Sequence, residues 1–434
     1  MKKTLLTSFT ILCLLLTLLL IGYKTSVKAL PTTWTVDDDG PADFHTIQEA
    51  IDHASPGDTV FVYNGTYYEH VVINKSVSLL GEDRELTIVD GGGTDSVISI
   101  TANSVSIKRF TIQKSGRTLY DSGILMDNSK GNDISHNTIT NNYHGIRLHY
   151  SSDNAVTDNN ASNNQYGISL ELSNDNRVSN NNASKNLYGI RLYYCSDNVV
   201  SSNRASNNQY GVRLDHSGDN MISENNVFSN NINGIYLYYS GNNVVSSNNI
   251  SNNQCGITLE RSSNNNTIYH NNLINNIDQV ESASRNVWDY DDEGNYWSDY
   301  TGQDIDEDGI GNTPYVVDEA NQDNYPLMGM FSVFKITWKD KTYHTTIICN
   351  STIFDFRFEV GRETGNKIIS FHVTGEDDTV GFCRVMIHTE LMNYSLIVLV
   401  DEEEIVATLL DVPDETHTYL YFTYSHSTKT VQII

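Results

Sequence analysis

Eight residues, "NNQYGVRL" at Asn207–Leu214, recur in nearly the same form through the middle of the chain. Close copies begin at Asn163, Lys185, Asn230 and Asn252. The glycines of the motif follow one another at intervals of 22 residues, with a single interval of 23: Gly123, Gly145, Gly167, Gly189, Gly211, Gly234 and Gly256. A short fixed period of this kind indicates a solenoid, in which each repeat packs against its two neighbours.

The pattern inside one period is that of short strands. Between Tyr188 and Asn208 the pieces "YGIRL", "NVVSS" and "NRASNN" alternate apolar with polar residues, and none has helical spacing over ten residues. Three short strands joined by tight turns describe one coil of a parallel β-helix, and each coil adds roughly 4.8 Å of height. We therefore predict an all-β protein with three strands per coil of about 22 residues.

The register of the coils can be read from the positions after each glycine. The first and third residues after it are aliphatic, and with a period of two they point inward: Ile146 and Leu148, Ile168 and Leu170, Ile190 and Leu192, Val212 and Leu214, Ile235 and Leu237, Ile257 and Leu259. Asparagines also recur in three columns: Asn132, Asn154, Asn176, Asn198, Asn220 and Asn243; Asn137, Asn159, Asn181, Asn203, Asn225 and Asn248; Asn142, Asn164, Asn186, Asn208, Asn231 and Asn253. Because asparagine tolerates left-handed backbone and its amide can bond to an amide one coil away, we interpret these columns as structural ladders.

The rest of the chain divides around this repeat. Residues 1–29 are predicted to be a secretory signal peptide, with an uncleaved membrane anchor through residues 4–23 as the alternative. Residues 30–120 form a cap and irregular first coils, in which Ile47, Ala50 and Ile51 share the face of a short capping helix. Residues 121–280 are the regular coils and residues 281–330 an aromatic, acidic cap. Residues 331–434 alternate in longer runs and predict an antiparallel β-sandwich.

Charge and cysteine content restrict the partners and the compartment. The chain has 27 basic and 54 acidic residues, and loss of the four lysines of residues 1–29 would lower the net charge from -27 to -31. Such a surface repels nucleic acid. Cys349 and Cys383 are positioned to pair in an oxidising compartment, although nothing in the sequence decides whether they do. We expect a secreted or cell-surface protein, and we make no prediction of its oligomeric state.

Several of these stretches together resemble a known family. The helix "TIQEAIDHASPGDTVFV" from Thr46, the "YGIRL" coils and the closing "GNYWSDY…DEDGIGNTPY…DNYPL" resemble the NosD-like proteins, which are grouped as periplasmic copper-binding or as carbohydrate-binding and sugar-hydrolase repeats. The resemblance covers residues 34–330 and implies a right-handed parallel β-helix. The sandwich, with "GFCRVMIHTELM", looks like a module appended to archaeal secreted proteins. The resemblance is specific for the fold and weak for activity.

Two polar rows alternate with the inward columns along the strand that starts at each glycine. They combine guanidinium, carboxylate, imidazole and phenol groups, which suit hydrogen bonding to a polysaccharide. The candidate ligand-binding residues are Arg147, His149, Glu171, Arg191, Tyr193, Arg213, Asp215, Tyr236, Tyr238 and Glu260. If the face is catalytic, the candidates are Arg191, Arg213, Asp215 and Tyr193, which lie within two coils of one another and include acid, base and cation. A polar strand face with no ligand is the alternative.

The stretch "DIDEDGIGN" resembles the first half of a calcium-binding loop. Asp304, Asp306 and Asp308 stand at alternate positions before a glycine, and the Ile310 carbonyl would be the next ligand. Tyr315 occupies the position of the usual bidentate carboxylate, so Asn312 or Asp318 would have to replace it. We expect structural calcium here. Copper is not expected, because the histidines are scattered and His144 and His149 fall on different faces.

The sequence therefore leaves three functions open. The first is a cell-surface or extracellular protein that binds a polysaccharide or cell-envelope glycan along the outward strand face without catalysis. The second is a polysaccharide lyase, hydrolase or epimerase that acts on the same face. The third is a structural surface or adhesion protein in which the solenoid is a spacer.

Overall fold

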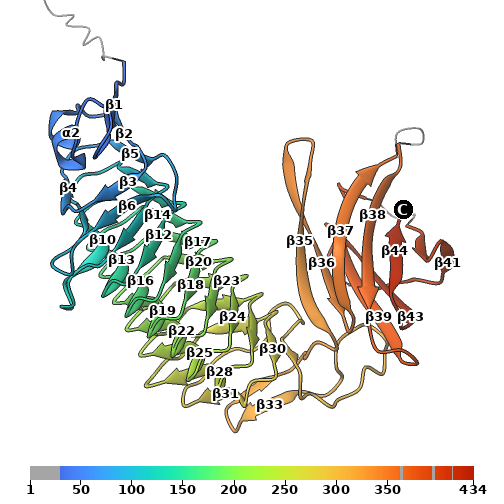
Figure 1. Ribbon diagram of the computed structural model, residues 1–434. Coiled ribbons are helices and arrows are strands. Elements are labelled where there is room, and N and C mark those ends of the chain that lie inside the picture. Colours follow the sequence, from blue (N-terminus) through green and yellow to red (C-terminus); the bar gives the residue numbers. More distant parts are fainter. Residues whose placement is uncertain (1–29, 362–364, 393–395, 413) are drawn as a thin grey trace, which may run out of the picture.

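The protein consists of a parallel β-helix followed by an antiparallel sandwich that turns back beside it (Figure 1). The computed structural model describes residues 30–361, 365–392, 396–412 and 414–434. Residues 1–29, to which the expectations of a signal peptide or an anchor apply, lie outside the described residues. Within the described ranges, no helix has both the length and the apolar character needed to cross a membrane.

Three parallel sheets run the length of the β-helix, and this confirms the predicted parallel β-helix with three strands per coil. The sheet whose strands contain the motif glycines is called the glycine-led sheet and has ten strands: β4 (Val71–Ile73), β7 (Ile98–Ile100), β10 (Ser122–Asp127), β13 (His144–His149), β16 (Tyr166–Glu171), β19 (Tyr188–Tyr193), β22 (Tyr210–Asp215), β25 (Asn233–Tyr238), β28 (Cys255–Glu260) and β31 (Asp278–Ser282).

The chain passes from each glycine-led strand to the second sheet and then to the third. The second sheet comprises β1 (Thr33–Val36), β2 (Thr59–Val62), β5 (Ser78–Gly81), β8 (Ser106–Lys108), β11 (Asp133–Ser135), β14 (Ala155–Thr157), β17 (Arg177–Ser179), β20 (Val199–Ser201), β23 (Met221–Ser223), β26 (Val244–Ser246) and β29 (Thr267–Tyr269). The third comprises β3 (Gly65–Tyr67), β6 (Thr87–Asp90), β9 (Thr111–Gln113), β12 (Thr138–Thr140), β15 (Asn160–Ser162), β18 (Asn182–Ser184), β21 (Arg204–Ser206), β24 (Asn226–Phe228), β27 (Asn249–Ser251), β30 (Asn272–Ile274) and β32 (Tyr296–Trp297).

The core of the β-helix is made of the predicted aliphatic columns. Ile168 pairs in register with Ile190, and Ile190 with Val212, so that side chains of one kind lie above each other. All twelve predicted column residues from Ile146 to Leu259 are fully buried. Their burial removes apolar surface from water, which is the largest favourable contribution to folding.

The three asparagine columns are hydrogen-bonded ladders at the corners of the coils. In one of them, the Asn181 backbone N–H donates to Asn203 Oδ1 at 2.9 Å, and the Asn181 amide donates to the Val156 carbonyl at 2.8 Å. One predicted member is wrong. Asn230, not Asn231, receives the hydrogen bond from the Asn208 N–H at 3.0 Å, because the extra residue of the 23-residue coil falls after the ladder position.

A short helix, α2 (Ile47–His53), closes the N-terminal end of the core as predicted (Figure 1). Thr46 caps it by accepting a hydrogen bond from the Glu49 N–H at 3.3 Å. Ile47, Ala50 and Ile51 are fully buried against the first coils, so the open end of the apolar core is covered.

The C-terminal part begins with the hairpin β33 (Tyr315–Asp318) and β34 (Asn321–Asp323) and continues as two antiparallel five-stranded sheets, as predicted. One contains β35 (Met330–Trp338), β36 (Lys341–Cys349), β39 (Val380–His388), β42 (Thr408–Leu409) and β43 (His417–Ser425). The other contains β37 (Thr352–Val360), β38 (Lys367–Thr374), β40 (Val398–Val400), β41 (Glu403–Ile405) and β44 (Lys429–Ile433). Cys349 and Cys383 are cross-strand partners with Sγ atoms 3.2 Å apart, and both are free thiols.

Candidate functional site

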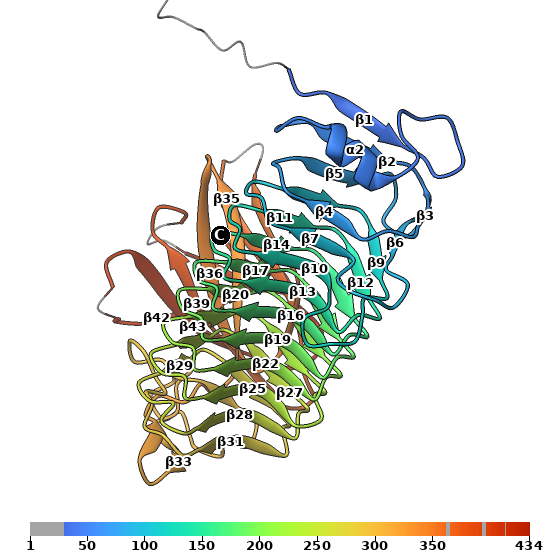
Figure 2. The ribbon, with the colours of Figure 1, turned by 90° about the vertical axis from the view of Figure 1, so that its left-hand side faces the viewer.

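The predicted binding face is the outer face of the glycine-led sheet. In Figure 2 this sheet faces the viewer, and the sandwich lies on the far side of the solenoid. The ion pair between Lys335 of β35 and Glu224, which follows β23, places the sandwich beside the second sheet. The sandwich therefore leaves the predicted binding face uncovered.

The four candidate catalytic residues lie together on β19 and β22. Arg191 Nε is 2.9 Å from Asp215 Oδ2, and Arg213 Nη2 is 2.8 Å from Asp215 Oδ1. The Arg191 guanidinium lies 4.7 Å from the ring centre of Tyr193. Asp215 is only 3% exposed, so this carboxylate holds two arginines in place and is not open to solvent as the alternation predicted. Two cations on one carboxylate leave the cluster with a net positive charge.

The other predicted face residues also form pairs across coils. Arg147 Nη2 is 2.5 Å from Glu171 Oε2, and Tyr236 donates to Glu260 Oε2 at 2.9 Å. His149 Nδ1 lies 2.8 Å from a carboxylate oxygen of Asp127. Within one strand, β25, Tyr238 stacks on Tyr236 with ring centres 6.3 Å apart. All the predicted residues therefore lie on one continuous surface, although Arg147 is nearly buried.

An aromatic column that the sequence analysis did not predict runs beside them. Tyr166, Tyr188 and Tyr210 immediately precede the motif glycines and stack with ring centres 4.8 and 5.2 Å apart. The Arg213 guanidinium lies 5.3 Å from the ring centre of Tyr188 and 5.0 Å from that of Tyr210. The tyrosine that begins each "YGIRL" is the sequence signal for this column.

A second unpredicted aromatic column follows the ends of the same strands. Tyr194, His216 and Tyr239 stack with ring centres 4.7 and 5.0 Å apart, and the two tyrosines are 46% exposed. Each of the three has a positive φ near 50°, a conformation in which bulky residues are uncommon. Because neighbouring rings cover each other's faces, the column offers ring edges and phenol hydroxyls to the solvent.

The chemistry available on this face is recognition by hydrogen bonds and planar groups. Burial and the nearby Arg147 charge lower the pKa of His144 to about 3, so this imidazole is neutral at physiological pH. Burial, reinforced by Glu260, raises the pKa of Tyr236 and keeps its phenol protonated. The carboxylates described above are engaged by arginines, by a phenol or by an imidazole. These groups can therefore hold a ligand through hydrogen bonds and ring contacts.

The acidic loop gathers three of its predicted ligands. Asp304, Asp306 and Asp308 bring one carboxylate oxygen each within 4.8 Å of the others, an oxygen donor set that fits calcium. The Asn312 amide donates to Asp306 at 2.9 Å, and the Ile310 N–H donates to Asp308 at 2.8 Å.

Asp318 does not belong to the group of three aspartates, and its role as a ligand stays a prediction. It lies at the end of β33, where both of its carboxylate oxygens accept hydrogen bonds from the Asn321 amide, at 2.9 and 2.7 Å. Tyr315, at the position of the usual bidentate ligand, instead stacks on Trp297 with ring centres 4.0 Å apart. A calcium ion here would need water to complete its coordination.

We predict that calcium binds this loop and stabilises the cap. Neutralising three adjacent carboxylates removes their mutual repulsion, so the melting temperature should rise by several degrees in about 1 mM calcium and fall again with EDTA. Differential scanning calorimetry of the full chain measures the change, and Asp306→Asn should abolish it. A melting temperature that is the same in calcium and in EDTA would contradict the prediction that calcium binds this loop.

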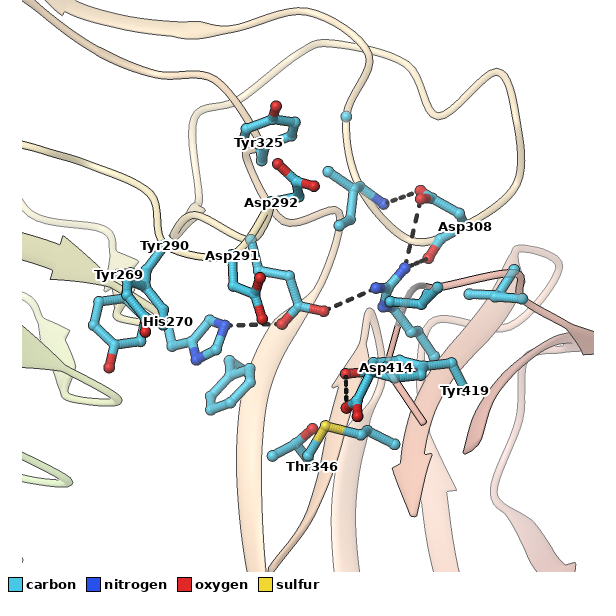
Figure 3. A pocket seen from close by; sticks show the side chains of 18 of the residues that line it. Tyr269, His270, Tyr290, Asp291, Asp292, Asp308, Tyr325, Thr346, Asp414 and Tyr419 are labelled. Atoms are coloured by element: carbon cyan, nitrogen blue, oxygen red, sulfur yellow. Dashed lines mark hydrogen bonds and ion pairs between the residues drawn. The ribbon is translucent and has the colours of Figure 1, made fainter. Parts of the chain in front are cut away.

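A cavity of about 860 Å³ lies where the β-helix, the cap and the sandwich meet, and His270, Asp308 and Tyr419 are among the residues that line it (Figure 3). Arg384 of β39 crosses this junction and donates to Glu293 Oε1 at 2.9 Å and to the Asp308 carbonyl at 2.9 Å. Glu293 also bonds His270 Nε2 at 2.8 Å, and His270 stacks on Phe331 with ring centres 3.9 Å apart. Arg384, Glu293 and His270 therefore pair with one another, and these contacts join the sandwich to the β-helix and the cap.

The chain belongs to the NosD family. The family model described as periplasmic copper-binding protein (NosD) matches residues 51–232 and 98–302, which together span more than half of the chain. A cell surface glycoprotein of Methanothermus fervidus is 36% identical over 139 residues, which are 31% of this chain and 21% of that protein. The match thus spans about a fifth of the relative's length.

Solved structures of similar fold have low sequence identity. Pectate lyase Pel9A is 13% identical with a TM-score of 0.48, and the match covers 64% of this chain and 82% of the lyase. DFA-IIIase from Arthrobacter chlorophenolicus A6 is also 13% identical, with a TM-score of 0.47 over 60% of this chain and 82% of that enzyme. These likenesses concern the fold alone.

The copper of the family description does not fit the side chains that the structure describes. Within the described residues, the groups able to hold a metal through three neighbouring ligands consist of aspartates only. Copper is usually bound by histidine, cysteine or methionine. His144 is buried against Tyr166 and His149 pairs with Asp127, so these two imidazoles do not converge. We assign no copper chemistry to this protein.

Proposed function

We propose that this protein is an extracytoplasmic glycan-binding protein, and that a polysaccharide lies along the outer face of the glycine-led sheet. The observation that carries the proposal is the cluster of Arg191, Arg213 and Asp215 beside the column of stacked tyrosines, on a face that the sandwich leaves open. A polymer with repeated hydroxyl groups matches a surface with repeated donors and acceptors.

The comparisons support the compartment. The NosD description is of a periplasmic protein, and the Methanothermus fervidus relative is named a cell surface glycoprotein. The chain's acidic surface agrees with a partner other than nucleic acid. Binding without turnover is favoured because the carboxylate most central to the face, Asp215, is buried between two arginines.

The paired variant Arg191→Ala/Asp215→Ala tests this proposal. We expect it to abolish binding to the polysaccharide found in a glycan-array screen of the wild-type chain, because both the donors and the carboxylate that orders them are lost. The double change removes both Arg191 and its partner Asp215, so Arg213 is the only charge of the cluster that loses its partner. Arg285→Ala, an exposed arginine at the far end of the β-helix, is the control and should bind normally.

The outcomes separate the three functions. Loss of binding with no turnover in the wild type supports a binding protein. If the wild type turns over the polysaccharide and the variant does not, the protein is an enzyme and not a binding protein alone. A wild-type chain that binds nothing on the array, in calcium and in EDTA, would leave the solenoid as a spacer.

A further inference from the structure

A groove with cationic residues lies at the corner where the chain passes from the third sheet to the glycine-led sheet. It has a volume of about 420 Å³ and its lining contains no aspartate or glutamate. Two cations border it, Arg117 and Lys185, and both are exposed. Neither makes an ion pair within the described residues. In a chain of net charge -27, a groove with free cations and no carboxylate stands out.

Both cations arise from departures from the repeat. The corner before β13, β16 and β19 takes three residues, but the loop before β10, residues 114–121, takes eight and carries Arg117 to the groove. Lys185 has a φ of 58° at a corner where the adjacent coils have Asn163 and Asn207. Asparagine adopts this left-handed backbone more readily than lysine, so the fold alone does not favour a lysine there.

The groove also holds uncommitted hydrogen-bond donors. The side chains of Asn141, Asn163 and Gln165 line it, are exposed, and have no side-chain hydrogen bond within the described residues. Tyr143, also in the lining, packs on Tyr166 with ring centres 5.7 Å apart, so the groove adjoins the tyrosine column of the binding face. Amide donors between two cations are the groups that hold carboxylates and sulfates.

We propose that this groove binds the anionic groups of an acidic polysaccharide, a polymer whose sugars carry carboxylate or sulfate. Arg117 and Lys185 pair with the anions, the amides donate to them, and the polymer continues over the tyrosine column to the Arg191–Asp215–Arg213 cluster, which is itself net positive. Because the Debye length is about 8 Å at physiological salt, the distant carboxylates of the protein surface do not cancel this local attraction. The inference rests on the proposed function and adds the charge class of the ligand.

The test compares three polymers on the full chain: polygalacturonate, dextran sulfate and neutral dextran. We expect an anionic polymer to bind more tightly than dextran, and the variant Arg117→Gln/Lys185→Gln to raise its Kd about tenfold or more, as expected for charge-assisted hydrogen bonds. The control, Lys130→Gln/Arg285→Gln, removes the same charge from exposed cations outside the groove and should leave Kd unchanged. All four side chains are exposed, so both variants should melt with the wild type.

Each result decides the inference. Preference for polygalacturonate over dextran sulfate, or the reverse, supports it and identifies the anion. Equal loss of affinity in the groove variant and the control would overturn the assignment of anion binding to the groove. Tight binding of dextran alone would overturn the acidic ligand and leave the proposed glycan-binding function standing, whereas binding of no polymer at all by any form would count against both.

Discussion

Replacing Asn181 with alanine should lower the free energy of unfolding by about 3–5 kcal/mol. Its amide oxygen accepts the backbone N–H of Asn159 at 3.0 Å. Its amide nitrogen donates to the carbonyls of Val156 and Ser179 and to Asn203 Oδ1, at 2.8, 3.1 and 3.0 Å. Alanine leaves these buried groups without partners in the middle of a ladder, and each unsatisfied group costs about 1–3 kcal/mol. Urea unfolding followed by circular dichroism measures the loss.

The matched control is Asn182, the next residue in the chain. Its side chain is half-buried, and its amide donates one hydrogen bond, to Asn160 Oδ1 at 3.1 Å. Asn182→Ala should cost less than about 1 kcal/mol. If the two variants lose the same stability, the ladders do not hold the coils together and the asparagines need another explanation.

Replacing Arg384 with methionine should destabilise the junction between the β-helix and the sandwich by about 3 kcal/mol. The side chains of Arg384 and Glu293 are 6% and 15% exposed, so methionine leaves a largely buried carboxylate with His270 as its remaining partner. We expect the sandwich to separate from the solenoid, and small-angle X-ray scattering should show a larger radius of gyration. An unchanged scattering profile would mean that apolar contacts alone hold the two parts.

Lys335→Met is the control for this variant, because the ion pair of Lys335 with Glu224 is exposed and should contribute less than about 1 kcal/mol.

Lowering the pH should have the same effect on the junction as the Arg384 variant. Burial works to raise the pKa of Glu293, but the His270 hydrogen bond and the Arg384 charge outweigh it and lower this pKa. A lowered pKa in the folded protein gives stability that is present above the ordinary glutamate range and lost as the pH falls through the folded pKa.

Most of the β-helix could be predicted from sequence because each coil repeats the same local rules. The glycine spacing and the aliphatic pairs such as Ile190 and Leu192 are independent of anything distant in the chain. The single wrong ladder position, Asn231, lies in the one coil with an extra residue, where the distance from Gly234 indicates Asn231 and the 22-residue spacing from Asn208 indicates Asn230. The spacing gives no means of choosing between them.

The site was harder to predict because it depends on contacts between coils and between the two parts of the protein. Alternation placed Asp215 on the outward face, but two arginines cover it, and one of them comes from the neighbouring coil. The pairing of Arg384 with Glu293 joins residues 91 positions apart, and no local sequence pattern predicts it. The tyrosine column was visible as the first letter of "YGIRL", yet only the structure shows that Tyr188 lies outward beneath Arg213.

Hydroxyl-radical footprinting of the full chain, with and without the bound polysaccharide, tests the central claim most directly. The exposed aromatic side chains Tyr194 and Tyr239 and the adjacent Tyr188 report on the glycine-led face. The account predicts that the polymer protects these tyrosines and leaves the exposed Phe354 of the sandwich as reactive as before. Protection confined to the sandwich, with the glycine-led tyrosines unchanged, would contradict the account and move the binding site to the C-terminal part.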